Sequence, residues 1–389
     1  MEKRTILVLF ATLFCVMTGF GIIIPALPYL TVDVFKLDSR AVGLLLASYS
    51  AMNVLCAPFW GRLSDRVGRK PVLLVGLAGL AVSFVIFGLA HETWVLFASR
   101  VVGGAFGAAA LPTAMAYAGD VTTDESRAKA LGMLGAGLGL GMVVGPALGG
   151  IAGGIGGHNP SLPFFVAAGL TVLTALFVAL ALPARQPSGA ERLGLFEALR
   201  TTGLTLWPLY LLSFIQMLAF TNMEATFVLF AKDRFALTMT QVGLMFMAMG
   251  LVSAGFQGGG VGKLITRFGE ATITRAGCAV LGVGFVLTPL AQTPSQLLGA
   301  FCFFGVGSAL LRTSLSTGVS RGASAGQGTA MGIMQSSESL ARVFGPALGG
   351  VLYFMAPGLP YQAGAAVMVV ALALAFLTMK GRAHERTTT

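Results

Sequence analysis

Long hydrophobic segments alternate with short polar loops along the whole chain. Most of these segments run for about 20 residues, the length an α-helix needs to cross the hydrocarbon layer of a membrane. The pattern predicts twelve transmembrane helices, at 6–30, 41–60, 71–90, 94–118, 130–155, 162–182, 206–230, 240–261, 272–290, 295–318, 328–353 and 361–379. The fold class is therefore predicted to be an all-α integral membrane protein.

The chain also repeats itself. The six residues GPALGG occur at 145–150 and again at 345–350, and nearly the same offset relates GRLSDRVG at 61–68 to GKLITRFG at 262–269. Duplicated halves in a membrane protein are typical of transporters whose site lies between the halves. We therefore predict two pseudo-symmetric six-helix bundles. The predicted parts are an N-terminal bundle at 1–182, a cytoplasmic linker at 183–205, a C-terminal bundle at 206–380 and a cytoplasmic tail at 381–389.

Composition and charge agree with a membrane protein. Hydrophobic residues make up 56% of the chain and charged residues 10%, whereas soluble domains carry about 25% charged residues. Most Lys and Arg residues fall on the side of the predicted termini, which by the positive-inside rule makes both termini cytoplasmic. The net charge of +10 is divided among separate loops without a long basic run, so nucleic-acid binding is not expected. The first five residues lead into a segment too long for a cleavable signal, and we expect it to stay as a membrane anchor.

No cofactor, metal or nucleotide site is predicted. The four cysteines lie in predicted spans, with no Cys-x-x-Cys pair and no His at ligand spacing. The segment GGGVGK at 258–263 resembles a phosphate-binding loop, but that motif requires Gly at 257 and Ser or Thr at 264, where Gln257 and Leu264 stand. Any transport must then be driven by a gradient.

Small residues form a ladder in two of the predicted helices. In the fifth span they recur every four residues, which places them on one helix face. The ladder consists of Gly137, Gly141, Gly145, Gly149 and Gly153, and its repeat in the eleventh span is Ser337, Ala341, Gly345 and Gly349. Pro146 and Pro346 can bend each helix at the same place. Two interpretations stay open: tight helix packing alone, or smooth faces that let one bundle rock against the other.

Four motifs carry a family resemblance. They are GRLSDRVGRKPV at 61–72, Arg100 with Gly103, Gly104 and Gly107 ending at Asp120, the segment 141–150, and GFGIIIPALP at 19–28. In this order and at these intervals the chain resembles the major facilitator superfamily, and within it the twelve-span drug:proton antiporters that include the tetracycline exporters. The resemblance implies that fold over essentially the whole chain, together with alternating access.

The resemblance also implies a latch at the cytoplasmic end. The motif after the second span supplies Gly61, Asp65, Arg66, Gly68 and Arg69. Asp65 would lie at the start of the eleventh span near Gly328, where a helix N-terminus stabilises a carboxylate, and Arg69 would pair with Asp120. The alternative is a solvated turn whose basic residues only set the orientation. The second copy has Thr266 and Glu270 at the positions of Asp65 and Arg69, which implies an asymmetric latch.

One position departs from the family pattern. Tetracycline exporters carry an aspartate in the first span, three residues before the Gly-x-Gly that aligns with Gly19 and Gly21, and this chain has Val16 there. Proton coupling must therefore rest on another carboxylate.

The seventh span offers such a carboxylate. A charge near the bilayer centre is costly, so Glu224 is a candidate functional residue by default. Its predicted helix face consists of Gln216, Phe220, Met223, Glu224 and Phe227, with Asn222 beside it. Burial disfavours the charged form, so Glu224 could exchange a proton for a cationic substrate. The alternative is a carboxylate that stays hydrated near the outer surface.

Two further charged positions lie within predicted spans. Glu338 precedes Arg342 by four residues, which favours an intrahelical ion pair with a structural or gating role. A substrate role for Glu338 with Gln335 is the alternative. Arg100 resembles the family's fourth-span arginine, which is credited with aiding proton transfer, but it could instead extend to the outer interface.

The leading hypothesis is a secondary transporter in a bacterial-type plasma membrane that exports small amphipathic or lipophilic compounds by proton antiport. Its partners would be a small-molecule substrate, protons and membrane lipid, and we expect a monomer. Alternatives of the same fold are a sugar or organic-acid symporter or facilitator, and a lipid or siderophore exporter. An enzyme is disfavoured because no nucleophile, base and acid occur together at a recognisable spacing. A channel is disfavoured because a latch implies alternating access.

Overall fold

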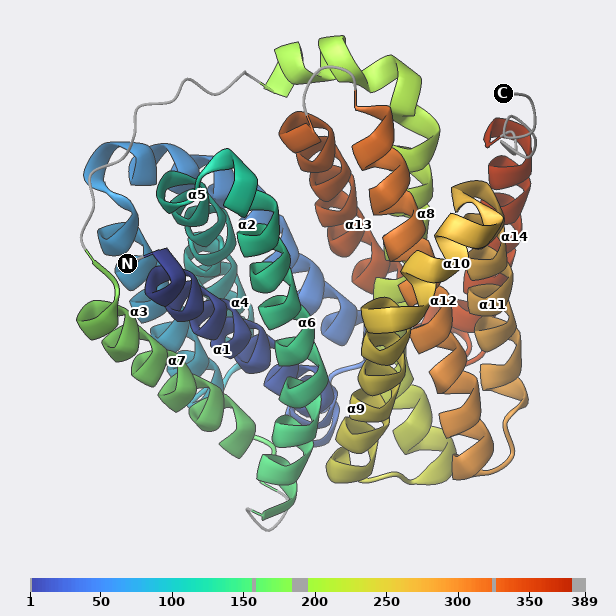
Figure 1. The fold of residues 1–389 in the computed structure, drawn as a ribbon. Helices are drawn as coiled ribbons and strands as arrows, with labels where there is room; N and C mark the ends of the chain where they lie inside the picture. Colours follow the sequence, from blue (N-terminus) through green and yellow to red (C-terminus); the bar gives the residue numbers. More distant parts are fainter. Residues whose placement is uncertain (1, 156–158, 184–194, 324–326, 380–389) are drawn as a thin grey trace. The chain divides into compact units, whose positions relative to one another are not determined.

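The computed structural model describes residues 2–155, 159–183, 195–323 and 327–379, and this part of the chain is helical with no strand (Figure 1). The α-helices and two π-helical turns, η1 and η2, follow in this order: α1 (Glu2–Tyr29), η1 (Leu30–Val34), α2 (Ser39–Val67), α3 (Arg69–Gly88), α4 (Thr93–Gly107), α5 (Ala110–Val121), α6 (Asp124–Ile155), α7 (Leu162–Ala181), α8 (Leu195–Phe235), α9 (Met239–Gly255), η2 (Phe256–Gly260), α10 (Val261–Phe268), α11 (Glu270–Leu290), α12 (Pro294–Gly322), α13 (Gln327–Met355) and α14 (Leu359–Thr378).

The predicted all-α membrane fold is confirmed. Among the described residues, 11 helical stretches are long and apolar enough to cross a membrane, and they match eleven of the twelve predicted spans. The predicted span at 328–353 corresponds to α13, which has the length, 29 residues, but is not among them. Glu338 and Arg342, two charged residues in the middle of this helix, lower its mean hydropathy below that of the eleven other stretches.

The chain forms two compact units. The first consists of Met1–Glu191 with Lys232–Gly250, and the second of Arg192–Ala231 with Leu251–Thr389. This division differs from the predicted bundles at 232–250, because the first half of α9 packs on α6, where Gly150 lies against Thr240 and Gly243 against Pro146. Within the predicted linker α8 begins at Leu195, and the membrane-spanning stretch of this helix begins at Leu206. Residues 184–194 of that linker and the tail at 381–389 lie outside the described residues.

Each unit is built on helix pairs that lie side by side (Figure 1). In the first unit α1 packs along α6 and α7, while α3 packs against α4 and α7. In the second unit α11 lies between α12 and α14 and packs on both.

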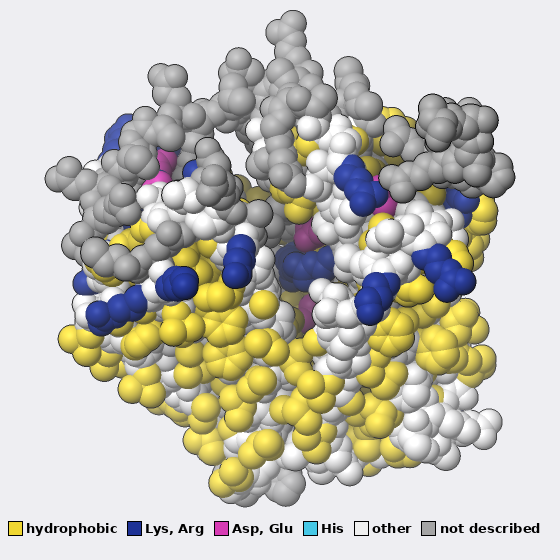
Figure 2. All heavy atoms as spheres, viewed as in Figure 1, with side chains coloured by type: hydrophobic (Ala, Val, Ile, Leu, Met, Phe, Trp, Pro, Cys, Tyr) yellow, Lys and Arg dark blue, Asp and Glu magenta, His cyan; other side chains and the backbone are white. Residues whose placement is uncertain are grey.

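The outer flanks are hydrophobic. On α7, Leu173, Leu176 and Leu180 recur along one face and are 64%, 55% and 87% exposed. Figure 2 shows hydrophobic side chains over the visible flanks of both units, with Lys and Arg side chains gathered toward one end of the helices. Such a continuous apolar surface is incompatible with water and suits lipid.

The duplication is visible in the backbone. Four described residues have a positive φ angle: Lys36 at 55°, Gly68 at 101°, Ala236 at 51° and Gly269 at 82°. They form two pairs, Lys36 with Ala236 and Gly68 with Gly269, whose spacings match the offset of the sequence repeat. Because this region is unfavourable for residues other than glycine, its recurrence indicates that both halves retain the same turns.

The glycine ladders join helices within a unit. Gly141, Gly145 and Gly149 of α6 lie against the α1 backbone, and Gly345 and Gly349 of α13 lie against Thr221 and Asn222 of α8. The equivalent helix pair in each unit therefore uses the same small residues. This face is occupied by a neighbour in its own unit and supports the packing interpretation of the sequence pattern.

Replacing Gly145 by alanine should destabilise the first unit. A Cβ atom there would lie 2.6 Å from the carbonyl oxygen of Thr18, well inside an ordinary C···O contact of about 3.3 Å. Overpacking of this kind costs about 1–3 kcal/mol, so thermal unfolding in detergent should occur at a lower temperature. Gly139→Ala, on the same helix with open space around it, is the matched control and should not lower that temperature. Equal unfolding temperatures for the two variants would contradict the assigned contact.

Candidate functional site

The turn from α2 to α3, the first corner, carries a buried ion-pair cluster. Gly68 adopts its positive φ angle there and leads into Arg69, the first residue of α3. The Arg69 side chain is 4% exposed, and its Nε donates to Asp120 Oδ2 at 2.9 Å. Its Nη1 donates to Ser64 Oγ at 2.7 Å and to Asp65 Oδ1. The guanidinium thus joins α2, α3 and α5. One of its contacts is the predicted ion pair of Arg69 with Asp120.

The other residues of the motif surround this cluster. Gly61 is buried, and its carbonyl oxygen accepts a hydrogen bond from Ser64 Oγ at 2.8 Å. Arg66 is exposed. The Asp65 side chain is 37% exposed, in contrast to 16% for Asp120. Of the two acidic partners of Arg69, Asp65 is therefore the more exposed.

The turn from α10 to α11, the second corner, has the same backbone but different charges. Gly269 has the positive φ angle and leads into Glu270, the first residue of α11. Glu270 Oε1 accepts from Arg321 Nη1 of α12 at 2.6 Å. Thr266 stands at the position of Asp65, and its hydroxyl donates to the carbonyl oxygen of Gly262 at 3.0 Å. The second corner therefore also has an ion pair. The sequence comparison of the two copies did not predict this pair.

Glu224 lies on a buried face of α8 in the second unit. It is 9% exposed, and the predicted neighbours Gln216 and Phe227 on the same face are 4% and 0% exposed. Phe227 stacks on Phe301 of α12 with ring centroids 3.7 Å apart, and Phe220 is half-buried. Glu224 thus lies on the same helix face as buried and half-buried aromatic side chains. The alternative of a hydrated carboxylate does not agree with this burial.

Asn222 has a different environment. Its Nδ2 donates to the carbonyl oxygen of Pro360 at 2.9 Å, at the start of α14, while its Oδ1 is buried without a hydrogen-bond partner among the described residues. One end of this side chain therefore joins α8 to α14.

A second carboxylate and one guanidinium lie on α13 in the same unit. Glu338 is 5% exposed, Arg342 is half-buried and Gln335 is exposed. Within the described chain no ion pair joins Glu338 to Arg342, although their spacing allows one.

Two carboxylates are buried in the second unit, Glu224 on α8 and Glu338 on α13. No hydrogen bond from the described residues reaches either carboxylate. Burying an unpaired carboxylate is costly, so both residues remain candidates for a functional role.

Arg100 is a buried cation in the first unit. It is 2% exposed and packs over the ring of Phe87, 4.4 Å from the centroid, with Tyr49 and Phe84 nearby. Its Nε and Nη2 atoms have no hydrogen-bond partner in the described part of the chain. An extension to the aqueous interface is inconsistent with this burial. Val16, at the position of the missing aspartate, is also buried, at 6% exposure.

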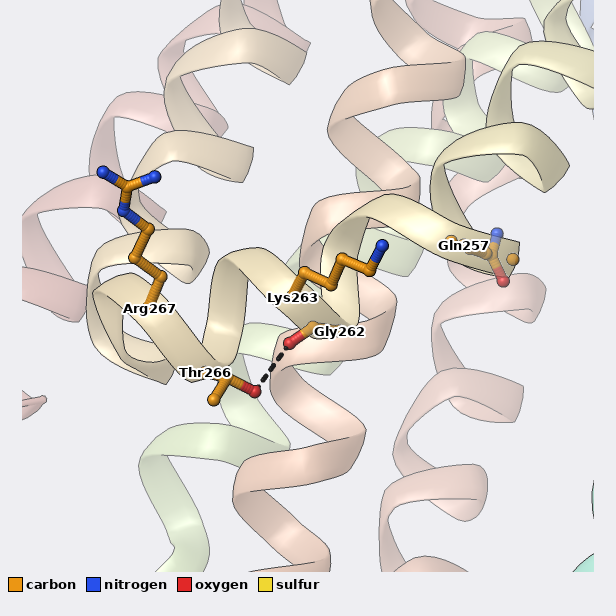
Figure 3. Close-up of a pocket in the computed structure, with 7 residues that line it drawn as sticks. Gln257, Gly262, Lys263, Thr266 and Arg267 are labelled. Atoms are coloured by element: carbon orange, nitrogen blue, oxygen red, sulfur yellow. Dashed lines mark hydrogen bonds between the residues drawn. The ribbon is translucent and has the colours of Figure 1, made fainter.

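The glycine-rich segment before the second corner lines an open pocket of about 560 Å³ in the second unit (Figure 3). Its backbone is helical throughout η2 and α10, unlike the strand, loop and helix of a phosphate-binding loop. In Figure 3 the side chains of Lys263 and Arg267 extend in different directions. They do not converge on a single anion position. No group of three metal-ligating side chains occurs within the described ranges either.

The sequence reading missed one contact cluster in the first unit. Lys232 Nζ donates to Asp33 Oδ1, and Tyr29 Oη donates to the carbonyl oxygen of Leu237. The available signal was the charge of Asp33 and Lys232 in loops predicted to lie on the same side of the membrane. Asp33 and Lys232 lie 199 positions apart, so their pairing depends on the packing of residues 232–250 on the first unit, which no local sequence pattern indicates.

Comparison with known proteins agrees with these features. The family model described as Major Facilitator Superfamily matches residues 9–325 and 209–389. The chain belongs to the major facilitator superfamily. It is 34% identical over 390 residues to the class C tetracycline resistance protein of Escherichia coli, covering 95% of this chain and 96% of that protein. Multidrug resistance protein 2 of Bacillus subtilis (strain 168) is 30% identical over 388 residues, covering 96% and 95%.

A solved structure supports the fold independently. The nucleoside transporter NupG superposes with a TM-score of 0.79 at 14% sequence identity, covering 96% of this chain and 98% of that one. At this identity the similarity concerns the fold alone. The fold, the apolar flanks and the family membership together make this superfamily member a multi-pass membrane protein.

Proposed function

We propose that this superfamily member exports amphipathic or lipophilic compounds in exchange for protons, by alternating access. Protons and a cationic substrate would compete for the buried carboxylates of α8 and α13. The observation that carries the proposal is the burial of two carboxylates in the second unit, Glu224 on α8 and Glu338 on α13, which no hydrogen bond from the described residues reaches.

The surroundings of Glu224 favour an amphipathic substrate over a sugar. Met223 and Phe227 lie beside Glu224 on α8 and are completely buried, and Phe227 stacks on Phe301 of α12, so this part of the second unit is apolar. Met and aromatic side chains can adapt to varied apolar shapes. A sugar site needs many hydrogen-bonding side chains. The similarity to relatives named tetracycline resistance protein and multidrug resistance protein supports the same substrate class.

We further propose that the first corner serves as a cytoplasmic latch. Asp65 would bind the start of α13 when the cavity faces outward and release it when the cavity faces inward. Its 37% exposure beside the buried Arg69 supports this role, because the carboxylate is held in place and still accessible. Both termini would lie in the cytoplasm, on the side of most loop Lys and Arg residues.

The proposal predicts a resistance phenotype. Bacteria lacking their own exporters and expressing this protein should survive at least about tenfold higher doses of one or more lipophilic cations such as ethidium, or of tetracycline. Cells expressing Glu224→Gln at equal protein level are the control and should stay sensitive. An unchanged dose response across a broad panel of compounds would instead favour the nutrient or lipid alternatives.

A further inference from the structure

The two corners share one backbone geometry. Gly68 has φ 101° and ψ 157°, and Gly269 has φ 82° and ψ 157°. Each glycine ends one helix and begins the next, and the two lie 201 positions apart by subtraction of their numbers. Among the described glycines, these two alone have a positive φ angle. The repeat is therefore retained at atomic detail at this point of both units.

An ion pair accompanies each corner, with the charges exchanged. Arg69 is the first residue of α3 and pairs with Asp120, the penultimate residue of α5. Glu270 is the first residue of α11 and pairs with Arg321, the penultimate residue of α12. Glu270 and Arg321 follow Arg69 and Asp120 by the same number of positions that separates the two corner glycines. At both positions the second corner carries the charge opposite to that of the first corner, and the ion pair is retained.

The shared element is a strut across the corner. In each unit the first residue after the glycine is tied to the end of the next membrane-spanning stretch, which is Thr93–Val121 in the first unit and Pro294–Gly322 in the second. Coulomb attraction does not depend on which partner carries which sign. A strut therefore tolerates charge exchange, whereas binding of Asp65 to a helix N-terminus would not. The acidic residue with that second role has no counterpart, because Thr266 occupies its position and bonds to Gly262.

We propose that Glu270 and Arg321 are a positioning pair for transport, equivalent to Arg69 and Asp120 with reversed polarity. The inference rests on the proposed transport function. The pair holds the start of α11 against the end of α12 while the second unit moves as a body, and transport needs the pair rather than its polarity. The Arg321 side chain is 68% exposed, and such a pair contributes little to global stability. Its loss should be seen mainly in the rate of transport.

Charge exchange tests this pair. In liposomes with an imposed pH difference, Glu270→Arg and Arg321→Glu should each lower the initial rate of ethidium or tetracycline uptake at least about fivefold, because each places like charges together. The double variant should return to within about twofold of the wild-type rate. Arg267→Glu is the matched control, an exposed arginine one turn before the corner, and should leave the rate unchanged.

A second measurement does not depend on transport. Hydrogen exchange of the backbone amides at the start of α11 should accelerate in both single variants and return to the wild-type rate in the double variant. Failure of the double variant to recover in either measurement, or single variants that behave as wild type, would overturn the inference. If the wild-type protein moves neither compound, the proposed function fails, and the exchange measurement alone decides whether the pair holds the corner.

Discussion

Glu224→Gln should abolish transport driven by a pH difference while leaving a folded protein. Glutamine has nearly the shape of glutamic acid and can occupy the apolar site among Phe227 and Met223 without leaving a buried charge. It cannot bind or release a proton, so we expect proton-driven accumulation of ethidium in liposomes to fall at least about 100-fold. The size-exclusion profile and the unfolding temperature should match those of the wild type.

A parallel variant separates the two carboxylates. Glu338→Gln removes the other acidic group near Arg342 and alters the net charge of the site by the same amount. If Glu224 is the proton carrier, Glu338→Gln should retain measurable proton-driven uptake with altered substrate affinity. Full activity of Glu224→Gln would remove that residue from the proton path, and loss of activity in Glu338→Gln alone would transfer the role to α13.

Arg69→Leu should have the second large effect, on both stability and transport. The guanidinium is 4% exposed and bonds to three side chains, so its removal takes a buried ion pair from the half-buried Asp120. Loss of one member of a buried charged pair should cost about 2–3 kcal/mol, and the unfolding temperature in detergent should fall accordingly. Transport should fall with it, because the corner no longer holds Asp65 in place.

Two controls distinguish geometry from charge at the first corner. Arg69→Lys keeps the positive charge but cannot donate to Asp120 and Ser64 in the same forked geometry, so it should recover stability only in part. Arg62→Leu removes an exposed arginine nearby, whose Nε donates only to the carbonyl oxygen of Pro58 at 3.2 Å, and should behave as wild type. Equal destabilisation by Arg62→Leu and Arg69→Leu would contradict the cluster described for the corner.

The fold was predictable because its signals are long and repeated. Apolar segments of membrane-spanning length and a chain that repeats with an offset near 200 residues predict the helices and the duplication without any knowledge of packing. The first corner was predictable for a different reason. Its motif is local, and the pairing of Arg69 with Asp120 came from the resemblance to a family.

Contacts between distant helices were harder to predict. The four-residue spacing of Glu338 and Arg342 makes an intrahelical ion pair possible, but the described part of the chain does not contain this pair. The glycine ladder identified a smooth face without identifying α1 as the helix that covers it. At the second corner the sequence comparison found Glu270 at the position of Arg69. It did not detect that Arg321, at the position of Asp120, also has the opposite charge, so that an ion pair is retained.

Proton release on substrate binding tests the central claim most directly. Purified protein in weakly buffered detergent near neutral pH should release up to about one proton per molecule when saturating ethidium or tetracycline is added, since proton and substrate compete for one carboxylate. Glu224→Gln should bind the compound without releasing a proton. Saturable binding to the wild-type protein with no proton release across the neutral pH range would contradict the account.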